Sequence, residues 1–250
     1  MNSKFDIKVK TNKVISEFCK VVKENKVGNI YSLFSGGRDS LVALHIANTF
    51  CKQYGVSLRA VYVDTTISTP GSTEYVKEVC KNFGVQLDIV RPKKDYFTLV
   101  EMWGFPTATR RWCCYHLKIE PLKTYFLDKP SDRIVVDGIR SKESSRRKSF
   151  PKIGLHKHFK CLCYHLIFEW DKDDVLNYIK EFKLKENPLY KFYSRATECW
   201  CPAEKTVNQF KQLKENHPEL FKKLIELEGK LRNGGSALYK GGKKIYLREL

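Results

Sequence analysis

A short segment around residue 36 carries the residue types of a phosphate-binding loop. It reads Ser35-Gly36-Gly37-Arg38-Asp39-Ser40, follows the apolar run at 29–34 and precedes an apolar helical pattern at 41–55. Glycine lets a backbone approach a ligand closely and adopt positive φ. Amide groups at a helix start, together with the helix dipole, favour an anion. The serine hydroxyls can donate further hydrogen bonds and Arg38 supplies a cation, so the segment predicts a phosphate cradle.

The spacing of this segment narrows the kind of phosphate site. It is neither the dinucleotide pattern G-x-G-x-x-G nor the Walker pattern G-x-x-x-x-G-K-[ST]. Two glycines could also serve only a tight turn between a strand and a helix. In parallel sheets, however, ligands bind at the carboxyl ends of strands, where this segment is expected to lie. The sequence therefore predicts a nucleotide site.

The cysteines are the second chemical feature. The chain has nine, and its first thirty residues lack an unbroken apolar stretch, which argues for a soluble cytoplasmic protein without a disulfide framework. Three lie alone on helical patterns and are expected to be small core residues, namely Cys19, Cys51 and Cys80. The other six form tight pairs: Cys113 with Cys114, Cys161 with Cys163, and Cys199 with Cys201. Such pairing suggests a ligand.

Two of these pairs form a candidate metal site. Four thiolates from two such pairs suit a 4Fe–4S cluster or an all-cysteine zinc site. A doublet at a helix start plus a distant pair is more typical of the cluster, and Trp200 would help to exclude solvent. We therefore expect a cluster, with zinc as the alternative.

The third pair has two interpretations. Cys161 and Cys163 lie within ten residues of three histidines, at positions 156, 158 and 165, which together could form a second metal site or replace a weak ligand of the first. The alternative is a buried strand in which the cysteines act as small hydrophobic residues.

Strands and helices alternate along the chain. Apolar runs predict strands at 29–34, 57–64, 85–92 and 132–139, and helical periodicity predicts helices at 11–25, 41–55, 73–84, 115–127 and 171–182. The last of these helices has a capping pattern, with Asp171 followed three residues later by Asp174. This order predicts an α/β fold with a parallel sheet and helices on both faces.

Length and charge complete this outline. We expect an N-terminal helix at 1–26, a main domain at 27–202 and a basic helical C-terminal extension at 203–250 that ends in a hairpin-like tail. No stretch approaches the ~18 apolar residues of a membrane span. The formal net charge is +18, and residues 138–160 carry eight Lys and Arg against one acid. This excess indicates either a solubilising surface or a nucleic-acid partner.

Several motifs in order resemble the phosphoadenosine-phosphosulfate (PAPS) reductase superfamily, especially its archaeal-type members. The loop matches S-G-G-x-D-S, the pyrophosphate loop (PP-loop) of N-type ATP pyrophosphatases. The motifs that follow are "VYVDTT", "RRWCCYHLKIEPL", "DGIRSKESSRRK", "FEWDKDDVLNYI", "NPLY" and "CWCP". The resemblance covers about residues 12–225 and implies an adenine nucleotide alpha-hydrolase-like, Rossmann-like fold.

The resemblance also assigns site residues. It implies that the phosphate chain crosses the loop at 35–40 and that Asp64 and Thr65 lie near the adenosine. The third motif places Gly138, Arg140, Glu143, Ser144 and Arg147 at matching positions. Arg140 and Arg147 are then candidate clamps for phosphate or sulfate oxygens, or members of the solvated basic patch. Arg38, Asp39 and Arg140 are the expected catalytic residues, with Asp39 either a Mg²⁺ ligand or a helix cap.

One departure from the family concerns the cysteines. Iron–sulfur members place cluster ligands at the positions of Cys113, Cys114, Cys199 and Cys201, but their distal pair is C-x-x-C, whereas this chain has C-W-C. Either the local backbone differs or only three of these cysteines bind.

The resemblance leaves three functions open. An ATP pyrophosphatase would adenylate an acceptor for sulfur transfer, with tRNA or DNA as a candidate acceptor and a protein as a candidate sulfur donor. A PAPS or adenylyl-sulfate reductase would need a nucleophilic cysteine, yet none follows Cys201 in this sequence, which leaves an outside thiol or a residue such as Cys161. A catalytically silent nucleotide- and nucleic-acid-binding module is the third. We favour the first, because the PP-loop is intact.

Overall fold

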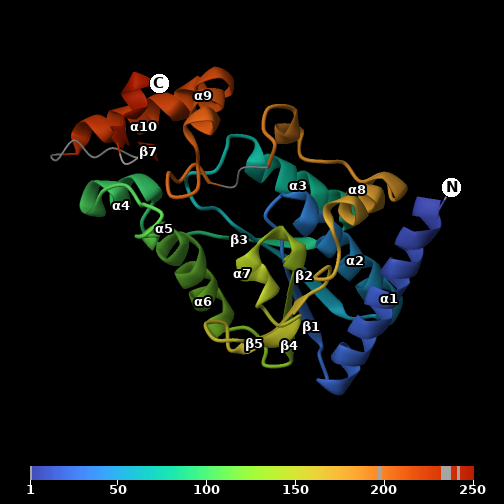
Figure 1. Ribbon diagram of the computed structural model, residues 1–250. Coiled ribbons are helices and arrows are strands. Elements are labelled where there is room, and N and C mark those ends of the chain that lie inside the picture. Colours follow the sequence, from blue (N-terminus) through green and yellow to red (C-terminus); the bar gives the residue numbers. More distant parts are fainter. Residues whose placement is uncertain (1, 196–198, 232–237, 241–242) are drawn as a thin grey trace. The chain divides into compact units, whose positions relative to one another are not determined.

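The computed structural model describes residues 2–195, 199–231, 238–240 and 243–250, which form two compact units (Figure 1). Unit 1 comprises Met1–Tyr62, Glu74–Ile89 and Tyr125–Pro188. Unit 2 comprises Val63–Thr73, Val90–Thr124 and Leu189–Leu250.

Unit 1 is built around a six-stranded sheet. Its strands are β1 (Asn29–Leu33), β2 (Ser57–Val63), β3 (Gln86–Val90), β4 (Arg133–Asp137), β5 (Ile153–His156) and β6 (Cys161–His165). The spatial order is β3-β2-β1-β4-β6-β5. β1 is parallel to both β2 and β4, β4 is parallel to β6, and β5 alone is shown antiparallel to its neighbour β6. Parallel neighbours end at the same edge, so the carboxyl ends of β1, β4 and β6 lie together.

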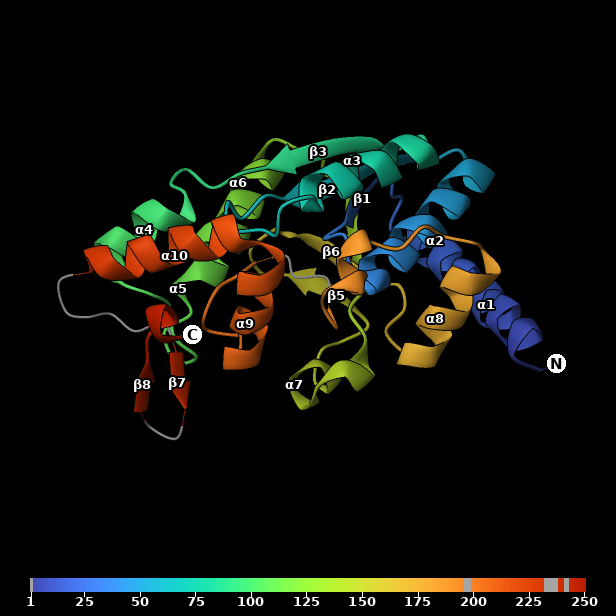
Figure 2. The same cartoon turned by 90° about the horizontal axis from the view of Figure 1, so that it is seen from above.

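Helices cover both faces of this sheet, as the sequence predicts. They are α1 (Asn2–Glu24), α2 (Arg38–Tyr54), α3 (Ser72–Phe83), α6 (Glu120–Leu127) and α8 (Lys172–Glu181). A 3₁₀ turn (Ser141–Glu143) and α7 (Ser145–Lys148) follow β4 and bury none of their residues. On one face α1, α2 and α8 pack side by side (Figures 1 and 2) and share a buried apolar cluster with β1 and β4. On the other face Tyr31 of β1 meets Phe126 of α6 edge to face, with ring centroids 5.5 Å apart. The α/β fold class is therefore confirmed.

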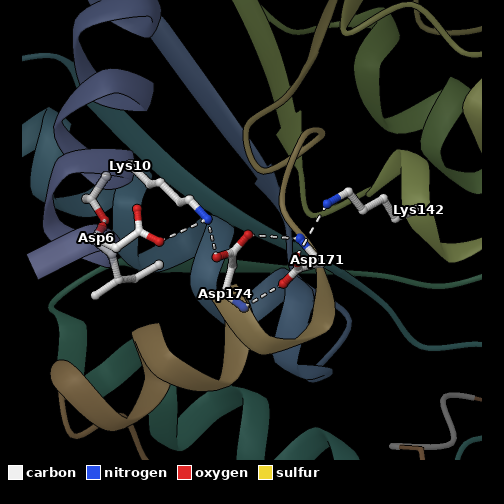
Figure 3. A network of polar contacts seen from close by, with 7 residues as sticks. Asp6, Lys10, Lys142, Asp171 and Asp174 are labelled. Atoms are coloured by element: carbon white, nitrogen blue, oxygen red, sulfur yellow. Dashed lines mark hydrogen bonds and ion pairs between the residues drawn. The ribbon is translucent and has the colours of Figure 1, made fainter. Parts of the chain in front are cut away.

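The start of α8 shows how the sequence fixes a helix in place. Asp171 and Asp174 form a capping box, in which each carboxylate accepts the other's backbone N–H at 3.0 Å. Lys10 of α1 donates to Asp174 at 2.6 Å and also lies 3.5 Å from Asp6, while Lys142 lies 3.4 Å from Asp171 (Figure 3). The predicted cap is thus present, and its acids also hold α1 and the 3₁₀ turn.

Unit 2 is mainly helical. Its elements are α4 (Tyr96–Trp103), α5 (Trp112–Cys114), a π-helical turn (Tyr115–Ile119), a 3₁₀ turn that begins at Pro188, α9 (Val207–Asn216), α10 (Pro218–Lys230), β7 (Leu238–Lys240), β8 (Lys243–Ile245) and a last 3₁₀ turn (Leu247–Glu249). β7 and β8 pair antiparallel, in agreement with a hairpin-like tail. The buried Glu228 of α10 accepts the N–H groups of Leu247 and Arg248, which anchors the tail. None of the described helices has the length and apolarity of a membrane span.

Candidate functional site

The predicted phosphate loop joins β1 to α2 in unit 1. Gly36 has φ +84°, which favours glycine, and Gly37 is the N-cap residue of α2 in extended conformation. The Ser35 and Ser40 hydroxyls lie 3.0 Å apart, and Ser40 Oγ donates to the Gly37 carbonyl at 2.9 Å. Because no side chain caps the helix at Gly37, its first-turn N–H groups can point to an anion.

Gly138 fixes the distance between the loop and the neighbouring strand β4. A Cβ atom at this position would lie 2.4 Å from the backbone C and O atoms of Asp39 and 2.8 Å from the Ser40 nitrogen. These atoms belong to the first turn of α2, so the end of β4 touches the helix start directly. Only glycine allows this approach.

Arg140 and Arg38 lie at the same helix start and have different partners. Arg140 is 9% exposed, and its Nε lies 3.0 Å from the Asp39 carboxylate. The two atoms form an ion pair without a hydrogen bond, so the buried Nε–H group has no acceptor within the described structure. Arg38 pairs with Glu186. Asp39 therefore pairs with Arg140 and is not the helix cap, which removes one of its two predicted roles.

Two residues of this site were not among the predicted site residues. Asn187 is buried and donates from Nδ2 to the Gly36 carbonyl at 3.1 Å, and Glu186 holds Arg38. Both follow α8 and lie about 150 positions from the loop, so no local spacing indicates them. The one available signal is the motif "NPLY", whose first residue is Asn187.

The basic run at 138–160 does not form one surface. Arg146 and Lys148 are exposed on α7, which follows β4 at the carboxyl edge of the sheet, and Arg147 pairs there with Glu143. The turn at 157–160 precedes β6, so its exposed lysines lie at the amino edge. The five residues of β6 separate the two groups by about 16 Å. Only the first group shares an edge with the loop.

Asp64 and Thr65 belong to unit 2 and lie in a tightly bonded turn. Asp64 accepts the Thr66 N–H and the Arg91 Nε–H, both at 3.0 Å. Thr65 is buried, with its hydroxyl 3.2 Å from that of Ser68. The turn has a rigid shape, since φ of Thr66 is +62° and its hydroxyl accepts the Tyr96 N–H.

The structure brings the predicted cysteine ligands together in part. Cys113 and Cys201 are buried with their sulfur atoms 3.0 Å apart, and Cys114 hydrogen-bonds to Cys113. Burial and the charges of Cys201, Cys113 and Cys199 hold the pKa of the Tyr96 hydroxyl well above its usual value. This hydroxyl is fully buried and has no hydrogen-bond partner among the described residues. Cys113, Cys199 and Cys201 thus act on one buried tyrosine hydroxyl, although no group of three or more potential ligands in the described ranges has metal-site geometry.

Trp200 fixes the C-W-C segment within unit 2. Its side chain is 0% exposed, its Nε1–H donates to Thr69 Oγ1 at 2.8 Å, and its backbone N–H donates to the Ile67 carbonyl at 3.0 Å. The middle residue of C-W-C is therefore an anchor, which leaves Cys199 and Cys201 on either side of it.

Cys161 and Cys163 lie on β6, as the buried-strand interpretation predicts, and both are buried. His156 Nδ1 accepts two backbone N–H groups, and His165 Nδ1 pairs with Asp137, so these rings are already engaged. The hydrogen bond from Cys163, together with the Arg133 guanidinium, lowers the pKa of Cys161 to about 7 against the opposing effect of burial. A second metal site does not form in the part of the chain that is described.

Sequence comparisons identify related proteins. The family model described as the phosphoadenosine phosphosulfate reductase domain matches residues 29–201. Two uncharacterized proteins of Methanocaldococcus jannaschii, MJ0973 and MJ0066, are 31% and 28% identical over 87% and 88% of this chain. The alignments include 52% and 47% of their lengths, so the chain spans about half of these curated relatives.

Structural comparisons show the same fold in proteins of low identity. The U34-tRNA thiolase NcsA from Methanococcus maripaludis, solved with its 4Fe–4S cluster, has a TM-score of 0.56 and 19% identity over 91% of this chain and 79% of its own. The phosphate complex of the Candida auris PAPS reductase has a TM-score of 0.53 and 18% sequence identity, over 71% of this chain and 82% of its own. Candida glabrata FMN adenylyltransferase with FMN and the ATP analog AMPCPP has a TM-score of 0.57 and 13% sequence identity, over 76% of this chain and 61% of its own. At these identities the likeness shows the fold alone.

Proposed function

Since the chain belongs to the phosphoadenosine phosphosulfate reductase domain family, we propose that it is an enzyme that uses ATP at the loop of residues 35–40. It would split ATP into pyrophosphate and an adenylyl group, and would transfer that group to an acceptor in a sulfur-transfer reaction. The observation that carries this proposal is Arg140. Arg140 is a nine-tenths buried guanidinium whose Nε–H group has no hydrogen-bond acceptor in the described structure, and it lies beside uncapped helix amides, an arrangement that favours an oxyanion.

The α2 amides, the loop serines, Asp39 and Arg140 have distinct roles in this proposal. The N–H groups at the start of α2 and the serine hydroxyls would hold the β- and γ-phosphates, and Arg140 would stabilise charge that develops on the α-phosphate. Asp39 is the proposed Mg²⁺ ligand, because its carboxylate is 30% exposed in the first turn of α2. Asp64, Thr65 and Arg147 remain proposed nucleotide contacts, although Asp64 pairs with Arg91 and Arg147 with Glu143.

ATP turnover tests the reaction. We expect labelled pyrophosphate from ATP labelled at the γ position, and a fall of about 100- to 1,000-fold in its release by Arg140→Gln. Cys19→Ala, on the distant α1, should retain wild-type turnover. Sulfite production that requires PAPS or adenylyl sulfate and a thiol would support the reductase instead. ATP binding without turnover would support the silent binding module.

A metal centre is the second part of the proposal. Cys113, Cys114, Cys199 and Cys201 would hold a 4Fe–4S cluster or Zn²⁺, since the Cys113 and Cys201 sulfur atoms lie 3.0 Å apart, Cys114 hydrogen-bonds to Cys113, and the charge of Cys199 acts on the same buried Tyr96 hydroxyl as those of Cys113 and Cys201. If only three of these cysteines held the cluster, its fourth iron would be open to bind sulfur. Anaerobically purified protein should contain iron, and Cys113→Ala should lose it, while Cys80→Ala should not. Zinc in place of iron would support the alternative.

The third part of the proposal is that the acceptor is a nucleic acid. Arg146 and Lys148 are exposed at the edge where the loop lies, and cations at such positions attract backbone phosphates. The matched control lies at the opposite edge, where Lys157 and Lys160 are equally exposed. Replacing the first pair by alanine should weaken tRNA binding and reduce its salt slope by about 2, whereas replacing the second should not. Equal effects of both pairs would contradict a specific docking edge.

A further inference from the structure

A histidine–carboxylate pair lies at the carboxyl edge of the unit 1 sheet. Asp137 is the last residue of β4 and His165 the last of β6, and the two face each other in register. His165 Nδ1 lies 2.7 Å from Asp137 Oδ1, and the same oxygen accepts the Ile139 N–H at 2.9 Å. The backbone beside the ring is fixed as well, because His165 N–H donates to the Lys152 carbonyl at 2.9 Å. Both partners are therefore held rigidly.

This pair lies near the loop without belonging to it. β4 is between β1 and β6 in the sheet, so with strand spacings of about 4.8 Å the end of β6 is roughly 10 Å from the end of β1. Gly138, which follows Asp137, touches the first turn of α2. The His165 side chain is thus too far from the loop to bind the phosphates held there. A second substrate that approaches those phosphates can reach it.

The hydrogen bond determines which nitrogen of His165 is available. Because Asp137 accepts from Nδ1–H, Nε2 of the neutral ring carries a lone pair. Phe168 stacks on the ring at 5.8 Å and Phe150 lies 6.3 Å from it, which holds its plane, and the side chain is 12% exposed. Two titratable groups interact electrostatically with members of the pair: His156 on β5 with both, and Cys163 on β6 with Asp137.

We propose that His165 accepts the proton of the acceptor during adenylation, with Asp137 as its positioning residue. This inference rests on the proposed function. The acceptor would be protic, such as a nucleobase lactam. Its oxygen forms a bond to the α-phosphorus, the bond from that phosphorus to the pyrophosphate oxygen breaks with its electron pair, and the lactam N–H proton moves to Nε2. The products are the adenylylated acceptor, pyrophosphate and protonated His165, so atoms and charges balance.

His165→Asn tests the proposal, because asparagine can still donate to Asp137 but has no basic nitrogen. His158→Gln is the matched control, since it changes a histidine of the same hairpin at the opposite edge of the sheet. Acceptor-dependent pyrophosphate release would be measured with bulk tRNA from about pH 5 to pH 9, together with ATP affinity and the thermal midpoint. We expect His165→Asn to bind ATP like wild type, to release pyrophosphate about 100- to 1,000-fold more slowly, and to lose the rise in rate with pH.

The outcomes separate this inference from the proposed function. Asp137→Asn should give the same loss of the pH-dependent rise, which serves as a second variant if His165→Asn does not fold. Retention of the wild-type rate and pH profile by His165→Asn would overturn the role of His165, and so would an equal loss in the His158→Gln control. A wild-type protein that releases no pyrophosphate with any acceptor would overturn the proposed function, and the inference with it.

Discussion

Replacing Gly138 by alanine should separate the end of β4 from the start of α2. The added Cβ would lie 2.4 Å from the Asp39 C and O atoms, whereas uncompressed contacts begin at about 3.5 Å. The two elements must therefore move apart by about 1 Å. Both sides of the clash are backbone, so no side chain can relieve it by changing rotamer.

The size of the effect follows from this displacement. Overpacking of a rigid contact costs about 1–3 kcal/mol, which corresponds to a decrease of roughly 2–12 °C in Tm for a chain of this size. A displacement of about 1 Å at a catalytic site can also reduce turnover about 100-fold. We expect Gly138→Ala to bind ATP weakly and to release pyrophosphate slowly even at temperatures where it is fully folded.

Calorimetric ATP titration, pyrophosphate release and thermal unfolding measure the three consequences separately. Gly229→Ala is the matched control, since Gly229 lies exposed in α10 with nothing within 4 Å of an added Cβ. It should leave ATP affinity unchanged and stabilise the chain by about 0.5–1 kcal/mol. Wild-type affinity and turnover in Gly138→Ala would refute the argument that this contact positions the loop.

Three further predictions concern stability. Asn187→Ala removes the buried hydrogen bond to the Gly36 carbonyl, so we expect a loss of about 1–3 kcal/mol in denaturant unfolding and a weaker ATP affinity. The backbone N–H of Asp174 and the Lys142 ammonium hold the pKa of Asp171 below its usual value. The stabilisation that the Asp171 carboxylate contributes is therefore present above about pH 4 and is lost as the pH falls further. The free energy of unfolding, measured against pH on the acid side, should decrease less steeply for Asp171→Asn than for wild type. Trp200→Phe loses the buried donor to a threonine hydroxyl, which should cost about 1–2 kcal/mol in urea unfolding.

The parts of the fold that the sequence predicts best are those whose signal is local. The loop at 35–40, the strands of the parallel sheet and the cap at Asp171 each depend on a few adjacent residues, and each is where we predicted it. The N-terminal helix shows how such a signal can be hidden. It begins at Asn2, inside the N-terminal helix expected at 1–26 and before the periodic stretch expected at 11–25, because the buried stripe continues through Thr11 to Ile7. Thr11 can be buried there since its hydroxyl donates to the Ile7 carbonyl at 2.7 Å.

Other features depend on contacts that no local pattern reports. The helix predicted at 115–127 has a π-helical turn at Tyr115–Ile119 before α6, which accommodates Pro121 near the start of a new helix, where its missing N–H is not needed. Asn187 reaches Gly36 only because the sheet brings the segment after α8 to the loop. The pairing of Asp137 with His165 likewise follows from strand register, which the sequence did not indicate.

Net charge alone is a poor guide to the partner of this protein, and the structure shows why. Four of the eight basic residues in the run at 138–160 are paired with acids of unit 1: Arg140 with Asp39, Lys142 with Asp171, Arg147 with Glu143, and Lys152 with Glu17. A cation that is paired with an acid offers less charge to a polyanion. The remaining four are split between two edges of the sheet, which lowers the charge density that any one phosphate backbone would meet. Among the cations of the run at 138–160, only Arg146 and Lys148 are exposed, without an acidic partner among the described residues, and at the same edge as the loop, so the comparison of the two edges tests whether this run binds a polyanion.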